Sequence, residues 1–345
     1  KIINEARLIE GVTITYGMHA AGVIISDNDD ISEYVPLMYD ARGNAMKCQC
    51  DKDEAEENGL LKMDFLGLKN IDIITSTLRR IRRRYGIDID AEKLPFEPKV
   101  FTDIFAKGLT NAVFQFESSG MKQMLRDFKP DKFEDIILLV AAYRPGPMQF
   151  IPSIISVKHC RKSPEYAVPE MESILGVTYG YPIYQEQVME IFHRFAGFSL
   201  GKSDIIRRYM SKKKTAKFIA YKDQFIEGMK KSGASVENAE RLWDQLVDFS
   251  KYAFNKSHAA AYALVAYITA WLKYHYPAEY ISSFMDLIAS DKMEEKMPGL
   301  ITDCKRIGIK VLQPDINRSE IGFSVQGNDI LFGLKNLNTN ALAIC

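Results

Sequence analysis

The sequence predicts a mixed α+β fold in which a small α/β region precedes a large helical region. Two segments near the N-terminus, 17–26 and 60–66, are rich in the small, β-branched and apolar residues that favour buried strands. From about residue 70 onward, apolar residues instead recur at the spacing of amphipathic helices. We therefore expect three regions, namely 1–70, 71–297 and a short β-containing stretch at 298–345.

The first region contains two further local signals. Residues 34–39 are compatible with a second strand, and the acidic residues 51–58 predict a short helix that ends near Gly59. The next segment, 60–66, reads as a strand. Together these signals make residues 1–70 a small α/β region.

Side chains on the strand at 60–66 alternate between two faces. Leu61, Met63 and Phe65 share one face, which we expect to pack beneath helices, whereas Lys62 and Asp64 share the other. An Asp and a Lys side by side suit a site for a metal ion and a phosphate, because carboxylate oxygens are the ligands that Mg²⁺ prefers and an ammonium group attracts phosphate. The alternative is an ordinary half-exposed strand with two charged residues on its wet face.

The helical region begins at 71–85, and proline and glycine mark the later breaks. Residues 143–183 contain a Pro-Gly-Pro turn and then four separate prolines, so we expect this stretch to be mostly loop. Short strands are expected at 309–312, 321–325 and 329–332. Further helices are expected at 98–106, 118–128, 131–142, 184–196, 201–213, 215–232, 235–249, 258–274 and 277–290.

Composition limits the possible classes of protein. No stretch approaches the roughly eighteen apolar residues of a membrane-spanning helix. The net charge of +0 argues against a protein that binds nucleic acid over its whole surface. Acidic residues gather at 51–57 and basic residues at 79–84 and 202–217, although each such run can simply be a solvated helix face.

The cysteines and the first residues bear on location and completeness. The five cysteines are odd in number, and Cys48-Gln49-Cys50 has no second pair to complete a zinc site, so free thiols in a reducing cytoplasm fit best. The chain starts at Lys1 with neither an initiator Met nor a signal-peptide pattern, so we expect it to be cut from a longer chain. Trp243 and Trp271 are expected to fill helical cores.

A basic helix is predicted around 201–214. On a helical wheel, one arc of this helix carries most of its basic residues, and the opposite arc is mostly apolar, with Ile205 and Ile206. This pattern suits a helix that docks on a core and binds a triphosphate or nucleic acid, or else a solvated surface helix. The basic residues of the arc are Arg207, Arg208, Lys212 and Lys214.

Polar residues also gather before the strongly apolar helix at 258–274. Asn255, Lys256 and His258 precede or begin that helix, and Ser257 is a candidate N-cap. A helix N-terminus with several donors suits an anion or nucleotide, but a polar capping loop is an equal alternative. Arg144 precedes a proline, so we expect it to be extended and to point away from the helix behind it. The alternative is a turn with an exposed arginine.

Several short blocks of the sequence form an ordered series. Lys-Met-Asp-Phe-Leu-Gly-Leu at 62–68 is one block, and Phe-Asn-Lys-Ser-His at 254–258 is another. The remaining blocks lie at 17–23, 113–122, 143–147, 184–189, 201–208 and 275–279. In content and order these blocks resemble one family, the DnaE-type alpha subunits of bacterial DNA polymerase III, and the similarity extends to about residue 335.

The resemblance implies a palm of the polymerase-beta-like nucleotidyltransferase type, followed by helical fingers. It assigns 1–70 to the end of the thumb and the C-terminal part of the palm, 71–297 to the fingers, and 298–345 to a linker toward a helix-hairpin-helix and clamp-binding region. In this family three palm aspartates hold two Mg²⁺ ions that align a primer 3′-hydroxyl with the α-phosphate of a nucleotide. Asp64 matches the third of these aspartates.

The other functional roles also follow from the resemblance. Lys62 becomes a catalytic candidate, and the incoming triphosphate would contact Arg144, Arg207, Arg208, Lys212 and Lys214. The nascent base pair would contact Asn255, Lys256 and His258. The implied partners are primer-template DNA, deoxynucleoside triphosphates, and, through regions outside this chain, a sliding clamp and other replicase subunits, in a cytoplasmic, nucleoid-associated setting without a membrane.

The chain departs from the family pattern in two places. The Pro-Asp-x-Asp-x-Asp motif that holds the other two aspartates is absent, so we expect residues 1–345 alone to be inactive as a polymerase. Residues 336–340 lack the glycines of a helix-hairpin-helix turn, which puts that element in doubt. An alternative function is a helical module that binds nucleotide or DNA without its own catalysis.

Overall fold

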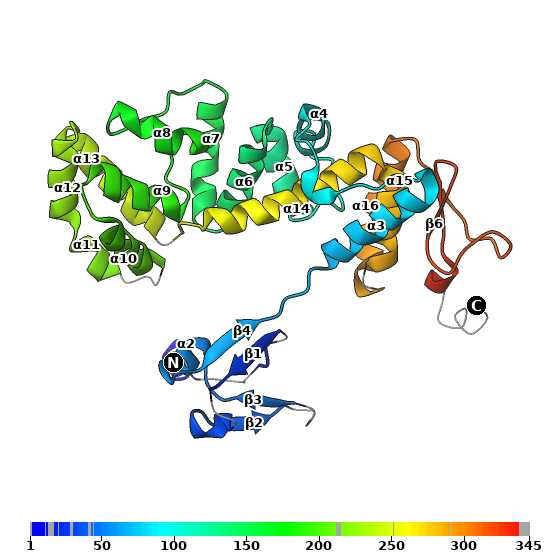
Figure 1. Ribbon diagram of the computed structural model, residues 1–345, viewed down its shortest axis with the longest axis horizontal. Helices are drawn as coiled ribbons and strands as arrows, with labels where there is room; N and C mark the ends of the chain where they lie inside the picture. Colours follow the sequence, from blue (N-terminus) through cyan, green and yellow to red (C-terminus); the bar gives the residue numbers. More distant parts are fainter. Residues whose placement is uncertain are drawn as a thin grey trace. The chain divides into compact units, whose positions relative to one another are not determined.

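The computed structural model has two compact units, residues 1–68 and 69–345. It describes all residues except 1, 11, 13–16, 20, 28–29, 41–42, 44, 212–214, 251, 289 and 338–345. Figure 1 shows the two units. Within the described residues, no helix combines the length and the apolar character needed to cross a membrane.

The first unit combines short helices with two antiparallel strand pairs. β1 pairs with β4, and β2 pairs with β3. The mixed α/β character is therefore confirmed, although the strands are shorter than predicted and β3 was not anticipated. The elements are α1 (Ile2–Leu8), β1 (Gly22–Ile25), β2 (Leu37–Tyr39), β3 (Met46–Cys48), α2 (Lys52–Glu57) and β4 (Leu61–Asp64).

Local sequence explains how α2 leads into β4. The Asp51 side chain accepts a hydrogen bond from the Glu54 amide, while the Glu54 side chain accepts one from the Asp51 amide, which completes a capping box. The helix ends before Gly59, whose φ of 84° suits glycine. Leu60 then enters a small core with Val35 and Ala55.

The prediction that the apolar face of β4 packs beneath helices is wrong. Leu61, Met63 and Phe65 are 56, 41 and 63% exposed in the structure. Because Leu61 and Met63 pair with Ile25 and Val23, which are also exposed, this face of the two strands is apolar and only partly buried. The unit's small core instead contains Leu60, so alternation predicted the two faces correctly and assigned their environments wrongly.

The second unit is mainly helical (Figure 1). The 20-residue helix α14 is its longest, and α6 and α3 pack against it. The helices are α3 (Lys69–Tyr85), α4 (Pro98–Val100), α5 (Ser119–Phe128), α6 (Phe133–Ala142), α7 (Ile151–Lys158), α8 (Glu172–Leu175), α9 (Gln185–Glu190), α10 (Leu200–Ser211), α11 (Thr215–Ile219), α12 (Lys222–Lys231), α13 (Val236–Ser250), α14 (Lys256–His275), α15 (Pro277–Leu287) and α16 (Ser290–Arg306).

Most of the helical segments predicted from periodicity are confirmed. The segment predicted as one helix at 215–232 is two helices, α11 and α12, and α16 was not predicted. The segment 143–183 is not mostly loop, because it contains α7 and α8. Pro152 lies in the first turn of α7, where a missing amide hydrogen costs no helical hydrogen bond, so proline there begins a helix rather than ending one. The N-cap of α14 is Asn255 and not Ser257, since the Asn255 side chain accepts from the His258 amide at 2.7 Å.

The C-terminal strands belong to the second unit. β5 (Val311–Leu312), β7 (Asp329–Leu331) and β6 (Ser324–Gln326) form a three-stranded sheet in that order. β6 and β7 contact α15. α16 also runs unbroken across residue 297, where the sequence suggested a boundary, with Pro298 inside the helix.

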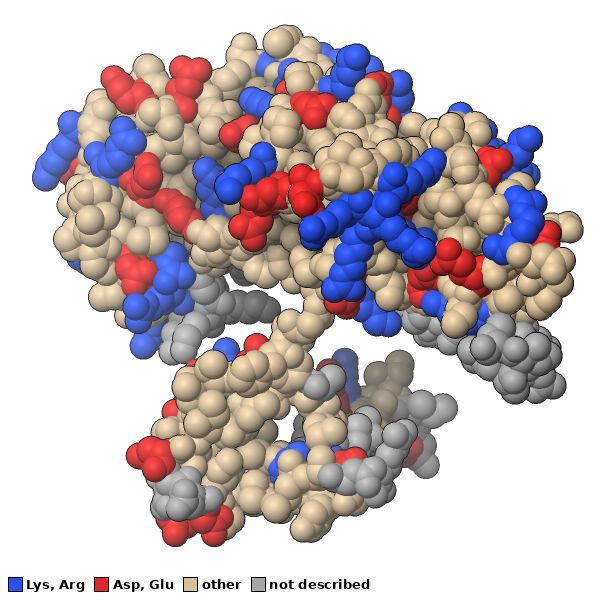
Figure 2. Space-filling model, turned by 45° about the vertical axis from the view of Figure 1, so that its right-hand side comes forward, with Lys and Arg blue, Asp and Glu red and all other residues tan. Residues whose placement is uncertain are grey.

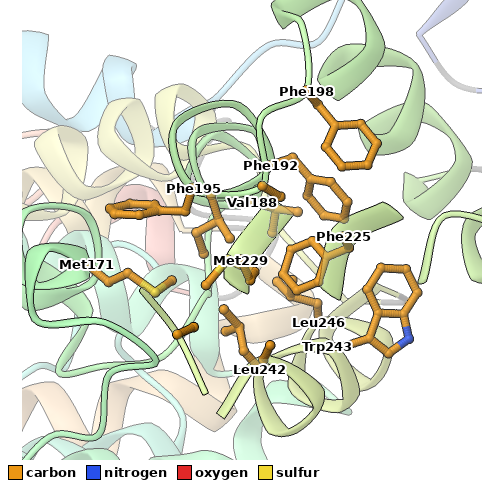
Figure 3. Packing of buried hydrophobic residues seen from close by; sticks show 14 of the residues in the cluster. Met171, Val188, Phe192, Phe195, Phe198, Phe225, Met229, Leu242, Trp243 and Leu246 are labelled. Atoms are coloured by element: carbon orange, nitrogen blue, oxygen red, sulfur yellow. The ribbon is translucent and has the colours of Figure 1, made fainter. Parts of the chain in front are cut away.

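An aromatic core joins α9, α12 and α13. Phe192, Phe225 and Trp243 are almost fully buried there (Figure 3). The Phe218 and Trp243 rings stack with centroids 4.8 Å apart. Stacked and tilted aromatic pairs add to the stability from burial. Trp243 therefore fills a core, as predicted.

Gly228 marks the closest approach of α12 to its neighbours in this core. A Cβ at this position would lie 2.0 Å from the Ala196 carbonyl oxygen, which belongs to the backbone and cannot easily move. We expect Gly228→Ala to lower the free energy of unfolding by about 1–3 kcal/mol, because overpacking outweighs the gain in helix propensity.

Urea denaturation measures this effect. Gly201→Ala is the matched control, since no atom lies within 4 Å of its added Cβ, and it should keep or raise stability by up to about 1 kcal/mol. Equal midpoints for the two variants would contradict the close contact.

Candidate functional site

Asp64 and Lys62 lie two residues apart on β4 and form an ion pair. The Lys62 side chain is largely buried, at 15% exposure, whereas Asp64 is 44% exposed. His19 Nδ1 lies 3.6 Å from the Asp64 carboxylate. The strand therefore presents a carboxylate that solvent and ligands can reach, held between a lysine and a histidine.

The surroundings of Asp64 keep it ionised. The hydrogen bond from Lys62, together with its positive charge, lowers the pKa of the Asp64 carboxyl below its usual range. A lowered pKa means that the carboxylate is charged at neutral pH and loses its charge only as the pH falls well into the acid range. Asp64 is thus available as an anionic oxygen ligand near pH 7.

Gly22 makes room for this group on the neighbouring strand. It pairs directly with Asp64, and a Cβ there would lie 2.7 Å from His19 Nδ1 and 2.9 Å from Lys62 Cε. Neither Gly22 nor His19 was identified as a functional residue from the sequence. Their block at 17–23 was noted, but the pairing of β1 with β4 that brings them to Asp64 is a long-range contact.

A cavity of about 750 Å³ lies beside these residues. Lys62, His19 and Gly22 line it, together with Cys48 and Lys52. Its size is within the range of about 300–1,000 Å³ that is usual for small-molecule sites.

Asp64 alone is not enough for a metal site. It offers the hard oxygen that Mg²⁺ prefers. Within the described part of the chain, however, no three His, Cys, Asp or Glu side chains are grouped to hold a metal ion. Asp64 is therefore a candidate ligand whose neighbours among the described residues do not complete such a group.

The second unit brings most of the other candidates together around Phe254. The start of α9 and the segment before α14 meet through a bridge between Tyr184 and Phe254. Arg144 Cζ lies 4.1 Å from the centroid of the Phe254 ring, and its Nη2 donates to the Tyr252 carbonyl at 2.7 Å. Residues far apart in sequence therefore converge here.

The position of Arg144 corrects the sequence-based expectation. Its Nε donates to the Ala141 carbonyl at 2.8 Å, so the side chain turns back onto the end of α6 rather than away from it. Burial lowers the pKa of the guanidinium from its ordinary value. Arg144 thus links the end of α6 to the segment around Phe254 through one hydrogen bond to each and through its contact with the Phe254 ring.

Asn255, Lys256 and His258 lie at the N-terminus of α14. Asn255 Nδ2 and the Lys256 amide both donate to the Glu186 carboxylate, at 3.0 Å for the shortest contact of each. The His258 ring packs on Phe254 and on Tyr262, with centroid distances of 5.4 and 4.3 Å. The Glu186 carboxylate therefore already accepts hydrogen bonds at the N-terminus of α14. The sequence did not predict this contact.

Arg207 and Arg208 share the carboxylate of Asp204 on α10. Arg207 Nε and Arg208 Nε each lie 2.9 Å from it, and these contacts lower the pKa of the Asp204 carboxyl. Arg207 also donates to Gln185 Oε1 at 3.1 Å, which links α10 to the start of α9. Lys212 and Lys214 lie outside the described residues.

The apolar side of α10 is narrower than predicted. Ile206 is fully buried, whereas Ile205 is 45% exposed. Arg207 and Arg208 differ as well, because Arg207 is 28% exposed and Arg208 is 67% exposed. The Arg207 guanidinium is thus more buried than that of Arg208, and it is held by both Asp204 and Gln185.

The two parts of this mixed α+β chain match two known domain families. Residues 1–67 match the bacterial DNA polymerase III alpha NTPase domain, and residues 70–233 match the bacterial DNA polymerase III alpha subunit finger domain. The chain belongs to the family of bacterial DNA polymerase III alpha subunits.

Similar full-length proteins carry the same family name. DNA polymerase III subunit alpha of Aquifex aeolicus is 41% identical over 98% of this chain, that of Thermus aquaticus is 42% identical over 97%, and that of Escherichia coli K12 is 40% identical over 96%. The chain spans only 28 to 30% of the length of these relatives. The family resemblance noted in the sequence is confirmed.

Proposed function

We propose that this chain is the part of a replicative DNA-directed DNA polymerase that joins the palm to the fingers. The observation that carries the proposal is the ionised Asp64 beside Lys62 on β4, in a chain of this family. The proposed reaction adds a deoxynucleoside triphosphate to a primer 3′-hydroxyl, directed by a template.

In this proposal Asp64 is one carboxylate ligand of Mg²⁺, and the remaining ligands come from outside the chain. The metal, when bound, would supply positive charge to the reacting phosphate. Lys62 holds the Asp64 carboxylate in place and adds a positive charge to the site. His19 lies close enough to limit how the carboxylate can turn.

The fingers contribute cationic and aromatic groups. Arg144, Arg207 and Arg208 are proposed to bind the triphosphate, with Lys212 and Lys214 as further candidates. Asn255, Lys256 and His258 are proposed to shape the surface for the nucleotide and the nascent pair, because they lie at the N-terminus of α14, where His258 packs on Phe254. Primer-template DNA and, through other regions, a sliding clamp are the proposed partners.

A second candidate function is a helical module that binds nucleotide or DNA without catalysis. The 67% exposure of Arg208 on α10 favours this alternative, because an exposed guanidinium can contact a phosphate without any part in catalysis. The two proposals differ in whether Asp64 is needed for turnover.

Arg207 allows a direct test of the triphosphate role in the full-length subunit. Its guanidinium is partly exposed and held by Asp204 and Gln185. Loss of one charged hydrogen bond costs about 1.5–3 kcal/mol, so we expect Arg207→Ala to raise the KM for the nucleotide roughly 10- to 100-fold.

Steady-state primer extension with varied nucleotide concentration measures this KM. Arg241→Ala is the control. Arg241 lies on α13, where it forms an exposed ion pair with Glu165, so its loss should leave the KM unchanged. An unchanged KM in Arg207→Ala would count against the triphosphate role.

A further inference from the structure

A cationic cavity lies within the unit of residues 69–345. It has a volume of about 460 Å³ and is bordered by α3 on one side and by β6 on another. Four arginines of α3 line it, namely Arg79, Arg80, Arg83 and Arg84. Figure 2 shows Lys and Arg side chains gathered in a patch on the visible face of this unit.

Two of the four arginines hold the fold together. Arg80 forms an ion pair with Asp286 on α15 and donates to the Phe323 carbonyl at 2.6 Å. Arg84 forms an ion pair with the buried Glu279 and donates to the Gly327 carbonyl. These contacts attach α3 to α15 and to the C-terminal sheet, so the walls of the cavity are fixed.

The other two arginines face the cavity without such partners. Arg79 and Arg83 are exposed, and neither has a carboxylate within ion-pair distance among the residues that the structure describes. They are four residues apart on one helix face, where like charges repel each other. Glu320 also lines the cavity, but one carboxylate leaves the group of lining residues net positive, since Glu279 is already paired.

Ser324 provides an independent sign of a ligand. It lines the cavity, its side chain is only 7% exposed, and its Oγ has no hydrogen-bond partner among the described residues. Buried hydroxyl groups are nearly always hydrogen-bonded. A donor without a partner, beside two guanidinium groups without carboxylates, matches the needs of an anion that carries several acceptor oxygens.

The cavity is separate from the candidate nucleotide residues. Asn255 caps the N-terminus of α14, whereas Tyr85 of α3 packs on Tyr276 just after its C-terminus. A 20-residue helix is about 30 Å long, so α14 holds the two sites far apart. Figure 1 likewise shows α3 and α15 at the opposite end of α14 from α9 and α10.

We propose that this cavity binds backbone phosphates of a DNA strand, through Arg79, Arg83 and the hydroxyl of Ser324. The planar guanidinium fork matches phosphate oxygens, and serine hydroxyls commonly contact the DNA backbone. The choice of DNA over other phosphate sources rests on the proposed function, whereas the anion site itself does not. Contacts of this kind hold a strand in register without reading its sequence.

The test measures equilibrium binding of labelled DNA to the full-length subunit without nucleotide, at several salt concentrations. Each phosphate contact contributes about 0.7 for single strands and 0.9 for duplex to the slope of log Kd against log salt. We expect the double variant Arg79→Gln with Arg83→Gln to lower this slope by roughly 1.4 to 1.8 and to weaken binding equally for different sequences.

Arg82→Gln is the matched control. Arg82 lies on the same helix but does not line the cavity, and it pairs with the exposed Asp88. We expect its slope to equal that of the wild type. Ser324→Ala should keep or raise thermal stability, because it removes a buried hydroxyl without a partner, and should still weaken DNA binding. A thermal melt of each variant shows whether it is folded.

Three results would overturn the proposal. The first is an unchanged slope and affinity in the folded Arg79/Arg83 double variant. The second is stabilisation by inorganic pyrophosphate that needs Arg79 and Arg83 while their loss leaves DNA binding intact, which would assign the cavity to a free phosphate compound. The third is the same pattern with an acidic peptide. None of these readouts depends on turnover, so a failure here is distinct from a failure of the Asp64 assignment.

Discussion

Asp64→Asn in the full-length subunit is expected to abolish nearly all nucleotide incorporation while primer-template affinity stays the same. The substitution keeps the size of the side chain but removes the charge that a metal ion needs. Loss of a residue that merely supports a metal ligand costs about 10- to 100-fold in activity or metal affinity. Loss of the ligand itself should therefore exceed about 100-fold in kcat.

Single-turnover primer extension and DNA-binding anisotropy give the two quantities separately. Glu57→Gln is the matched control, because Glu57 is an exposed carboxylate of the same unit at the end of α2. Near-normal turnover in Asp64→Asn would show that Asp64 is not in the metal site. It would then favour the alternative of a module that binds without catalysis.

Gly22→Ala is expected to lower incorporation by roughly 10- to 100-fold through a single methyl group. The added Cβ would collide with His19 and Lys62 and would come within 3.2 Å of Asp64 Oδ1. The neighbouring side chains must shift to relieve the contact, and a displacement of about 1 Å at a reacting centre can cost 100-fold in rate. DNA affinity should change little, because the substitution disturbs the packing around Asp64 and Gly22 is not one of the residues proposed to contact DNA.

The control for this variant is Gly67→Ala. No atom lies within 4 Å of a Cβ at Gly67, which follows β4 in the same unit, so incorporation should remain at the wild-type level. A crystal structure or a thermal melt of Gly22→Ala would show that the fold is kept. Equal rates for the two glycine variants would mean that the packing of His19, Lys62 and Asp64 does not matter for turnover.

The fold class was predictable because its signals are local. Helical periodicity identified most helices of residues 69–345 but missed α7, α8 and α16, and strand propensity located β1 and β4. The capping of α14 was misassigned by two residues because Asn255 and Ser257 are both good N-caps, and only the backbone geometry distinguishes them. Proline in 143–183 was also ambiguous, since it both begins helices and interrupts them.

The candidate site was predictable only in part. Asp64 and Lys62 were identified because two residues on one strand face are neighbours by alternation. His19 and Gly22 were missed because strand pairing brings them to Asp64 from about forty residues away, and no local pattern reports such a contact. The same holds for Glu186, which reaches Asn255 across a sequence separation of 69.

The sequence by itself determined the α+β class, the order of the helices, the family and the carboxylate on β4. Periodicity and ordered motifs carry this information, because they depend on residues that are close together in the chain. Tertiary structure alone decided which arginines of α3 form ion pairs with described residues. Arg80 and Arg84 are held by Asp286 and Glu279 while Arg79 and Arg83 are not, and this difference depends on how α3 packs against α15.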